Sequence, residues 1–217
     1  MIVFFDLDGT LTDPREGITR SIAHALERMG VAPPPLDDLT FAIGPPLRHS
    51  LAQLLADERR ETVEQALAHY RERFADVGLF ENVPYEGIAE TLSALRGAGA
   101  RLFVATSKPL VYADRIVRHF GLDSHFESVH GCELDGTRED KRDLLPYILQ
   151  THALRSEDAT MIGDRGVDMR AARVHGLRGI GALWGYGSRE ELLEAGADDL
   201  ADSPLALRTK LIRPHHA

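Results

Sequence analysis

Two carboxylates, Asp6 and Asp8, lie two residues apart near the start of the 217-residue chain, directly after the apolar run 2–5. The apolar run predicts a short buried strand, and Gly9 after Asp8 allows the backbone to turn sharply. Two acids at the end of a buried strand repel each other and lose water, which is costly unless a cation neutralises them. Because oxygen ligands favour a hard ion, the stretch indicates a Mg²⁺ site. The alternative is a loop in which Asp and Gly simply form a turn.

A second pair of acids, Asp164 and Asp168, lies four residues apart in the segment Met-Ile-Gly-Asp-Arg-Gly-Val-Asp. The residues before Asp164 predict a strand and those after it a helix, so the pair falls at a strand-to-helix turn. One helical turn separates the two carboxylates, which lets both face one ion. The alternative is an acidic first helical turn, which is favourable for the helix dipole.

Hydroxyl and ammonium groups that could contact a phosphoryl group lie at the end of another predicted strand and at the start of a predicted helix. Thr106 and Ser107 end an apolar run, and a hydroxyl with adjacent amides suits a phosphoryl oxygen. They could also cap a helix, because Pro109 is near a helix start, and both roles can coexist. Lys108 and Lys141 are the candidate cations that phosphoryl transfer would require in addition to a metal. Most lysines lie on the surface, so solvent exposure is the alternative for each.

The elements that must position these groups are read from the hydrophobic pattern. Strands are expected at 2–5, 101–105, 126–130, 159–162 and 179–183, and helices at 87–96, 110–120, 141–151, 167–174, 188–195 and 204–212. Alternating strands and helices imply βαβ units, and therefore an α/β fold with a doubly wound parallel sheet. Ligands of such sheets bind beyond the carboxyl ends of the strands, where the acids and hydroxyls fall.

Residues 14–83 show no strand pattern and instead contain four predicted helices, at 15–29, 36–41, 44–56 and 58–77. We therefore expect an inserted four-helix unit at 14–83. The α/β core would be assembled from residues 1–13 and 84–217.

These motifs resemble those of the haloacid dehalogenase-like (HAD) phosphatases. D-x-D-G-T at Asp6 resembles the first motif of that superfamily, and G-D-x-x-x-D at Asp164 resembles the fourth. Thr106 matches the hydroxyl residue of the second motif and Lys141 the lysine of the third. The four occur in the family's order and cover essentially the whole chain. The resemblance implies a Rossmann-like core with Mg²⁺ as the cofactor.

The resemblance also implies roles for individual side chains. Asp6 would be a nucleophile that becomes transiently phosphorylated, and Asp8 would act as general acid and base. Dehalogenases carry no acid at the second position, so Asp8 favours phosphate chemistry. Metal ligands would be Asp6, Asp8 and Asp164, with Asp168 acting directly or through water. The catalytic set would be Asp6, Asp8, Thr106 and Lys141, and the substrate-binding set Gly9, Thr10, Ser107, Lys108 and Arg48.

The helical unit resembles the C1-type cap of this superfamily, which closes over the site and contacts the leaving group. Its hinges would lie near 13–14 and 82–84. Arg48 lies in a segment similar to that of phosphoglycolate phosphatases and nucleotidases, and would meet a second anionic group or remain solvated. Arg71 and Arg73 are weaker candidates for the same contact. Pro14 replaces the Ser found in many relatives.

The segment Trp184-Gly-Tyr-Gly-Ser also resembles the phosphoglycolate phosphatase branch. We therefore expect a small phosphorylated metabolite as substrate, with 2-phosphoglycolate first and a 5′-nucleotide or pyrophosphate as alternatives. Relatives of the β-phosphoglucomutase type carry a histidine twelve residues after the nucleophile. This chain has Ile18 at that position, which argues against a phosphomutase. A non-catalytic phosphate-binding protein is the alternative from another class, because fold does not settle function.

The composition narrows the partners. A net charge of −9 without a long basic run argues against nucleic acid. No apolar stretch approaches the roughly 18 residues that a membrane span needs, and the N-terminus lacks the features of a signal peptide. The single Cys132 cannot form an internal disulfide, which fits a reducing compartment. We expect a cytoplasmic monomer or homodimer.

Overall fold

A six-stranded parallel sheet forms the centre of the computed structural model, which describes residues 1–212 of the chain. The strands lie in the order β5-β4-β1-β6-β7-β8, and every pair is parallel. This confirms the predicted doubly wound α/β fold. Their bounds are β1 Ile2–Phe5, β4 Arg101–Pro109, β5 Ser128–Cys132, β6 Ala159–Gly163, β7 Arg178–Ala182 and β8 Asp199–Ala201.

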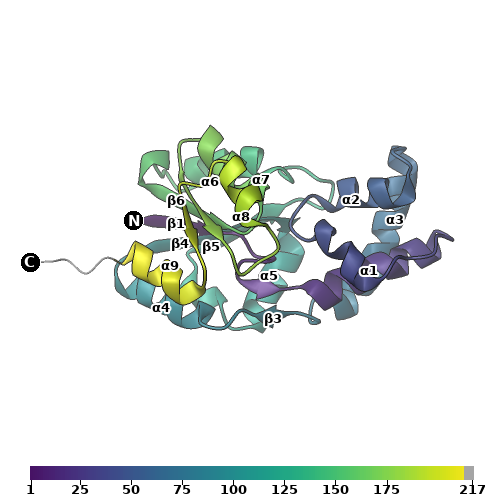
Figure 1. The fold of residues 1–217 in the computed structure, drawn as a ribbon, viewed down its shortest axis with the longest axis horizontal. Coiled ribbons are helices and arrows are strands. Elements are labelled where there is room, and N and C mark those ends of the chain that lie inside the picture. The colour runs from purple at the N-terminus through teal and green to yellow at the C-terminus, as the bar shows by residue number, and fades with distance from the viewer. Residues whose placement is uncertain (213–217) are drawn as a thin grey trace, which may run out of the picture.

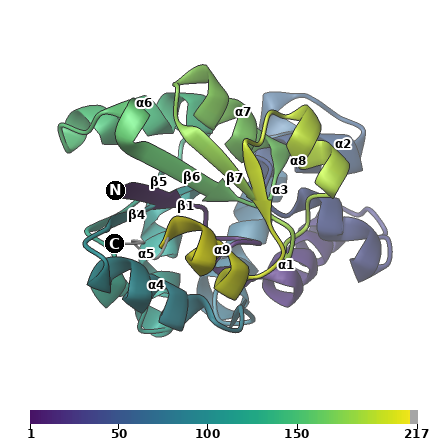
Figure 2. The same cartoon turned by 60° about the vertical axis from the view of Figure 1, so that its left-hand side comes forward.

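Helices cover both faces of the sheet because successive strand residues point to opposite faces. Val3 and Phe5 pack into one apolar cluster, and Ile2 and Phe4 into another. Figure 2 shows α6 and α7 over one face and α4, α5 and α9 over the other, with α8 beside α7. The bounds are α4 Ile88–Gly97, α5 Leu110–His119, α6 Lys141–Thr151, α7 Gly166–Val174, α8 Arg189–Glu194 and α9 Pro204–Leu211, with 3₁₀ turns η3 Asp123–His125 and η4 Ser156–Asp158.

A helical segment is inserted between two short strands that pair antiparallel, Thr12 with Pro84 and Asp13 with Val83. The segment lies at one end of the molecule, beyond the carboxyl ends of the sheet strands (Figure 1). Its apolar faces pack on one another through residues such as Ile22, Leu51 and Leu67, which are buried. The bounds are β2 Thr12–Asp13, α1 Arg15–Arg28, η1 Leu36–Ala42, α2 Leu47–Leu55, α3 Arg60–Arg73, η2 Phe74–Gly78 and β3 Val83–Pro84.

The structure differs from the sequence expectations at several boundaries. The helix expected at 36–41 is a 3₁₀ helix, and the long helix expected to reach residue 77 ends at Arg73 and continues as a π-helical turn. The edge strand β8 and the β2–β3 pair were not predicted, because two or three residues are too short to show a period-2 pattern. β4 extends to Pro109, beyond the expected end at residue 105, because it pairs with β5 again after a register shift.

Among the described residues, no helix combines the length and the apolar character required to cross a bilayer.

Candidate active site

Three carboxylates meet at the carboxyl edge of the sheet. β1 and β6 are neighbours, so the ends of both strands deliver their acids to one place. One oxygen from each of Asp6, Asp164 and Asp168 lies within 4.8 Å of the others, and all three side chains are buried. Burial raises the pKa of Asp164 well above its ordinary value, and the negative charges of Asp6 and Asp168 raise it further. A buried group of like charges of this kind suits an oxygen-coordinated cation such as Mg²⁺.

The loop after β1 holds Asp164 in place. Thr10 Oγ1 donates a hydrogen bond to Asp164 Oδ1 at 3.1 Å, and the Tyr186 backbone N–H donates to Oδ2 at 2.8 Å. Gly9 passes directly against this carboxylate with φ +84°, and a Cβ on Gly9 would lie 2.2 Å from Asp164 Oδ2. Trp184 supports the same loop by donating from Nε1 to the Thr10 carbonyl at 3.0 Å. Gly9 and Thr10, expected to contact substrate, therefore lie beside Asp164.

Lys141 joins two of the three carboxylates. Its Nζ lies 2.7 Å from Asp6 Oδ1 and also pairs with Asp168 Oδ1. Burial alone would lower the pKa of Lys141, but the charges of Asp168 and Asp6 raise it above its ordinary value. The second oxygen of Asp168 accepts the Arg165 backbone N–H at 3.0 Å. Asp168 therefore caps α7, as the helix-turn alternative predicted, and it also pairs with Lys141.

Asp8 and Lys108 form a separate buried pair. Lys108 Nζ lies 2.8 Å from Asp8 Oδ2 and 4.5 Å from the ring centroid of Phe74. Asp8 Oδ1 is buried without a hydrogen-bond partner in the described part of the chain. Burial raises the pKa of Asp8, although Lys108 opposes the rise. The Asp8 carboxylate thus lies with Lys108 rather than within the three-carboxylate group, where the sequence had also placed it as a metal ligand.

Thr106 and Ser107 lie within the last part of β4. Thr106 Oγ1 accepts the Lys108 backbone N–H at 3.2 Å. The alternative that these hydroxyls cap a helix is wrong, because α5 begins at Leu110 after Pro109 and no side chain caps it. Solvent exposure of Lys108 and Lys141 is also wrong, since they are 8% and 2% exposed.

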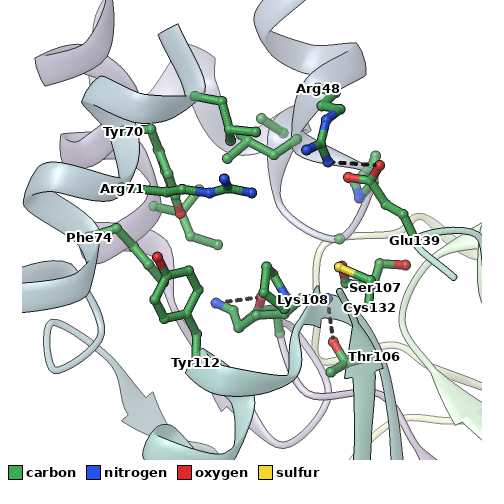
Figure 3. Close-up of a pocket in the computed structure, with 18 of the residues that line it drawn as sticks. Arg48, Tyr70, Arg71, Phe74, Thr106, Ser107, Lys108, Tyr112, Cys132 and Glu139 are labelled. Carbon is green, nitrogen blue, oxygen red and sulfur yellow. Dashed lines mark hydrogen bonds and ion pairs between the residues drawn. The ribbon is translucent and has the colours of Figure 1, made fainter. Parts of the chain in front are cut away.

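A pocket of about 660 Å³, which includes space open to solvent, lies above Asp6 and Asp8. Its far wall comes from α1, α2, α3 and α5 (Figure 3). This wall is largely apolar and aromatic. Tyr70 stacks on Phe74 with 5.0 Å between ring centroids, and Tyr112 meets Phe74 edge-on at 5.5 Å.

The arginines of the helical segment differ in their partners. Arg48 donates from Nε to Glu64 at 2.7 Å, from Nη1 to Glu139 at 3.4 Å, and from Nη2 to the Leu134 carbonyl at 3.0 Å. Its charge is therefore already paired, which the sequence could not show. Arg71 also lines the pocket. Arg73 instead pairs with Glu81 at 2.7 Å.

The described residues thus form a parallel α/β sheet with acids, a hydroxyl and buried lysines at its carboxyl edge. The chain matches the profile described as "Haloacid dehalogenase-like hydrolase" over residues 3–182. It therefore belongs to the haloacid dehalogenase-like hydrolase family, as its motifs indicated.

Named relatives are similar over most of the chain. A protein named 5′-nucleotidase from Pseudomonas aeruginosa is 50% identical over 191 residues, covering 88% of this chain and 86% of the relative. A phosphoglycolate phosphatase from Agrobacterium fabrum is 31% identical, covering 97% and 91%. A protein named tyrosine-protein kinase PtkA from Mycobacterium tuberculosis is 41% identical over 86% of this chain, which spans 63% of that longer relative.

The fold has also been observed by crystallography. The crystal structure of a predicted phosphatase from Clostridium acetobutylicum superposes with a TM-score of 0.93 at 41% identity, covering 97% of both chains. The chain is thus a phosphatase of this hydrolase family.

Proposed function

We propose that the chain is a Mg²⁺-dependent phosphomonoester hydrolase in which Asp6 is the nucleophile. The observation that carries the proposal is the position of the Asp6 carboxylate, which lines the pocket and is held by Lys141 beside Asp164. Asp6 would attack phosphorus and form an acyl phosphate, while Lys141 and the Thr106 hydroxyl balance the charge that develops on the phosphoryl oxygens. Water would then hydrolyse the acyl phosphate.

Asp8 suits the role of proton carrier. Burial raises the pKa of Asp8, which favours proton exchange at this carboxyl, and its unpartnered Oδ1 is available to a leaving oxygen. Asp8 would give this proton to the leaving alcohol and later take one from the attacking water. Lys108 would hold the other oxygen of Asp8 throughout.

The donor set fits Mg²⁺, because the grouped ligands are all carboxylate oxygens, and burial together with the charges of Asp6 and Asp168 raises the pKa of Asp164. Asp6 and Asp164 would hold the ion, with Asp168 at its side. When bound, Mg²⁺ would neutralise these carboxylates and polarise the phosphoryl group.

We further propose that residues 14–83 act as a cap domain over a core of residues 1–13 and 84–217. The β2–β3 pair is the place where the inserted segment leaves and rejoins the core, which suits a hinge. The segment supplies most of the wall that faces Asp6 and Asp8, and Tyr112 of α5 in the core completes it. Its closure would exclude water from the acyl phosphate.

The pocket favours a nucleoside 5′-monophosphate as substrate. An apolar, aromatic wall suits a flat organic group, and a relative that shares half of its residues is named 5′-nucleotidase. 2-Phosphoglycolate is the second candidate, because relatives near 30% identity are named phosphoglycolate phosphatase. A second anionic group is less suited to this pocket, because Glu64 and Glu139 already neutralise Arg48. PtkA bears a different activity in its name, so similarity alone does not fix the substrate.

The test is phosphate release with Mg²⁺ from nucleoside 5′-monophosphates, 2-phosphoglycolate, pyrophosphate, sugar phosphates and p-nitrophenyl phosphate. Asp6→Asn should abolish release, whereas Asp38→Asn, an exposed carboxylate in the helical segment, should not. The proposal predicts the highest kcat/KM for a nucleotide. Absence of release from every compound, the aryl phosphate included, would contradict hydrolase function.

A further inference from the structure

The pocket above the carboxylates has two chemically different sides. One side is the aromatic wall of Tyr70, Phe74 and Tyr112. The other is a polar edge, where Arg71 of α3 and Glu139 of the core loop reach in from opposite sides (Figure 3). A flat group lying on the aromatic wall would present its edge to these two side chains.

Arg71 is an available donor. Its one side-chain hydrogen bond among residues 1–212 runs from Nη2 to the Leu134 carbonyl at 2.6 Å, and it forms no ion pair with a described carboxylate. Its Nε is buried without a partner. The bond to Leu134 fixes the guanidinium at the rim, which leaves Nη1 free to donate to a ligand acceptor.

Glu139 is an available acceptor. Its Oε2 receives one long hydrogen bond, from Arg48 at 3.4 Å, and Oε1 has no hydrogen-bond partner in the described chain. Arg48 is shared with Glu64, which it contacts more closely, at 2.7 Å. Glu139 is therefore only partly satisfied within the protein, and a ligand N–H would complete its hydrogen bonding.

Arg71 offers a hydrogen-bond donor and Glu139 offers an acceptor on the opposite side. This pair disfavours a second anionic group on the substrate and favours a neutral group with an acceptor next to a donor. An anion placed at Arg71 would also face Glu139, and the like charges would repel. A heterocyclic base with a ring N–H next to a carbonyl has the matching pattern, with the carbonyl facing Arg71 and the N–H facing Glu139. Hypoxanthine, guanine, uracil and thymine share this edge.

The geometry points to Arg71 and Glu139 as a base-recognition pair that selects nucleoside 5′-monophosphates bearing a ring N–H next to a carbonyl. The inference rests on the proposed phosphomonoesterase function and names the substrate class of the same pocket. Adenine and cytosine present the reverse pattern, an amino group beside an unprotonated ring nitrogen. With these bases the amino group faces Arg71, and two acceptors meet at Glu139. A site built to hydrogen-bond one pattern discriminates strongly against a ligand that leaves its polar groups unpaired.

The experiment measures kcat/KM for IMP against AMP and for UMP against CMP, and compares the ratios within each variant. The wild type should favour IMP and UMP by about tenfold or more, a selectivity equivalent to one well-placed hydrogen-bonding pair. Arg71→Met should bring both ratios toward one. Glu139→Gln, whose amide offers a donor as well as an acceptor, should narrow them or reverse the IMP preference. Arg28→Met, an exposed arginine of α1, should keep the wild-type ratios.

The possible failures can be told apart. Equal kcat/KM for IMP and AMP in the wild type, or unchanged ratios in Arg71→Met, would overturn the base-recognition pair and leave nucleotide hydrolysis intact. Hydrolysis of p-nitrophenyl phosphate without hydrolysis of any nucleotide would overturn both the pair and the nucleotide substrate. Loss of all phosphate release in the wild type would overturn the phosphomonoesterase function itself.

Discussion

Substitution of Gly9 by Ala tests the packing of the loop after β1 against Asp164. A Cβ on Gly9 would lie 2.2 Å from Asp164 Oδ2 and 2.7 Å from Oδ1, and φ is +84°. Gly30 is the matched control, because its φ is +75° and nothing lies within 4 Å of its added Cβ. The two positions share the conformational cost and differ in the clash.

The expected magnitudes follow from this comparison. A left-handed conformation costs a non-glycine residue about 1–2 kcal/mol, so Gly30→Ala should lower the free energy of unfolding by that amount. Gly9→Ala should lose at least about 2 kcal/mol more, in the range of an overpacked core, or should push the carboxylate aside. Displacing a reacting group by about 1 Å costs on the order of 100-fold in rate, so phosphate release should fall correspondingly.

The assay pairs urea unfolding with phosphate release for both variants. Gly30→Ala should retain wild-type kcat/KM. If Gly9→Ala unfolds at the same urea concentration as Gly30→Ala and releases phosphate as fast as the wild type, the close approach of Gly9 to Asp164 is not a constraint, and the site geometry described above is incorrect.

Three other perturbations test separate parts of the molecule. Lys141→Met removes the cation from two buried carboxylates. It should lower the free energy of unfolding in urea by about 3–5 kcal/mol and abolish phosphate release. Normal phosphate release would refute a catalytic role for Lys141. Burial and the charge of His152 lower the pKa of His130 to about 4. Below about pH 6.5 the unfolded chain therefore binds more protons than the folded one, so the free energy of unfolding should fall as the pH drops from about 6.5 to 4. After allowance for the partial exposure of His130, the expected loss is about 1 kcal/mol. His130→Gln should flatten that slope, and an unchanged slope would assign it to other groups. Chelation of the metal by EDTA should stop phosphate release. Excess Mg²⁺ should raise the melting temperature of the wild type by several degrees but leave that of Asp164→Asn unchanged. An equal rise in melting temperature in both proteins would show that the ion binds elsewhere.

The sheet and the acids at its edge could be predicted because each signal is local. Apolar runs before Asp6 and Asp164 mark strand ends, and alternation with helices implies parallel strands whose ends share an edge. The sequence did not reveal that β1 lies between β4 and β6, which is what brings Thr106 and Asp164 to Asp6. Strand order arises from tertiary packing and has no local signature. The edge strand β8 was missed because three residues carry no period.

The sequence could name the candidate lysines and arginines but not their ion-pair partners, several of which lie far away along the chain. Lys108 was predicted as a candidate cation from its place two residues after Thr106, but its pairing with Asp8, 100 residues back along the chain, was not predicted. Arg48 was expected to meet a substrate anion or to remain solvated, but it pairs with Glu64 at 2.7 Å and, more weakly, with Glu139 at 3.4 Å. Arg71 was given less weight than Arg48 although it has no carboxylate partner in the described residues. Only the packing of the helical segment on the core decides which arginine is paired.

The most direct test of the central claim is to locate the phosphoryl group on the protein during turnover. Asp8→Asn should slow hydrolysis of the acyl phosphate, so acid quenching after mixing with substrate and Mg²⁺ should trap it for peptide mass spectrometry. We predict one phosphoryl adduct on Asp6, absent from Asp6→Asn. An adduct on another residue, or wild-type phosphate release by Asp6→Asn, would contradict nucleophilic catalysis by Asp6.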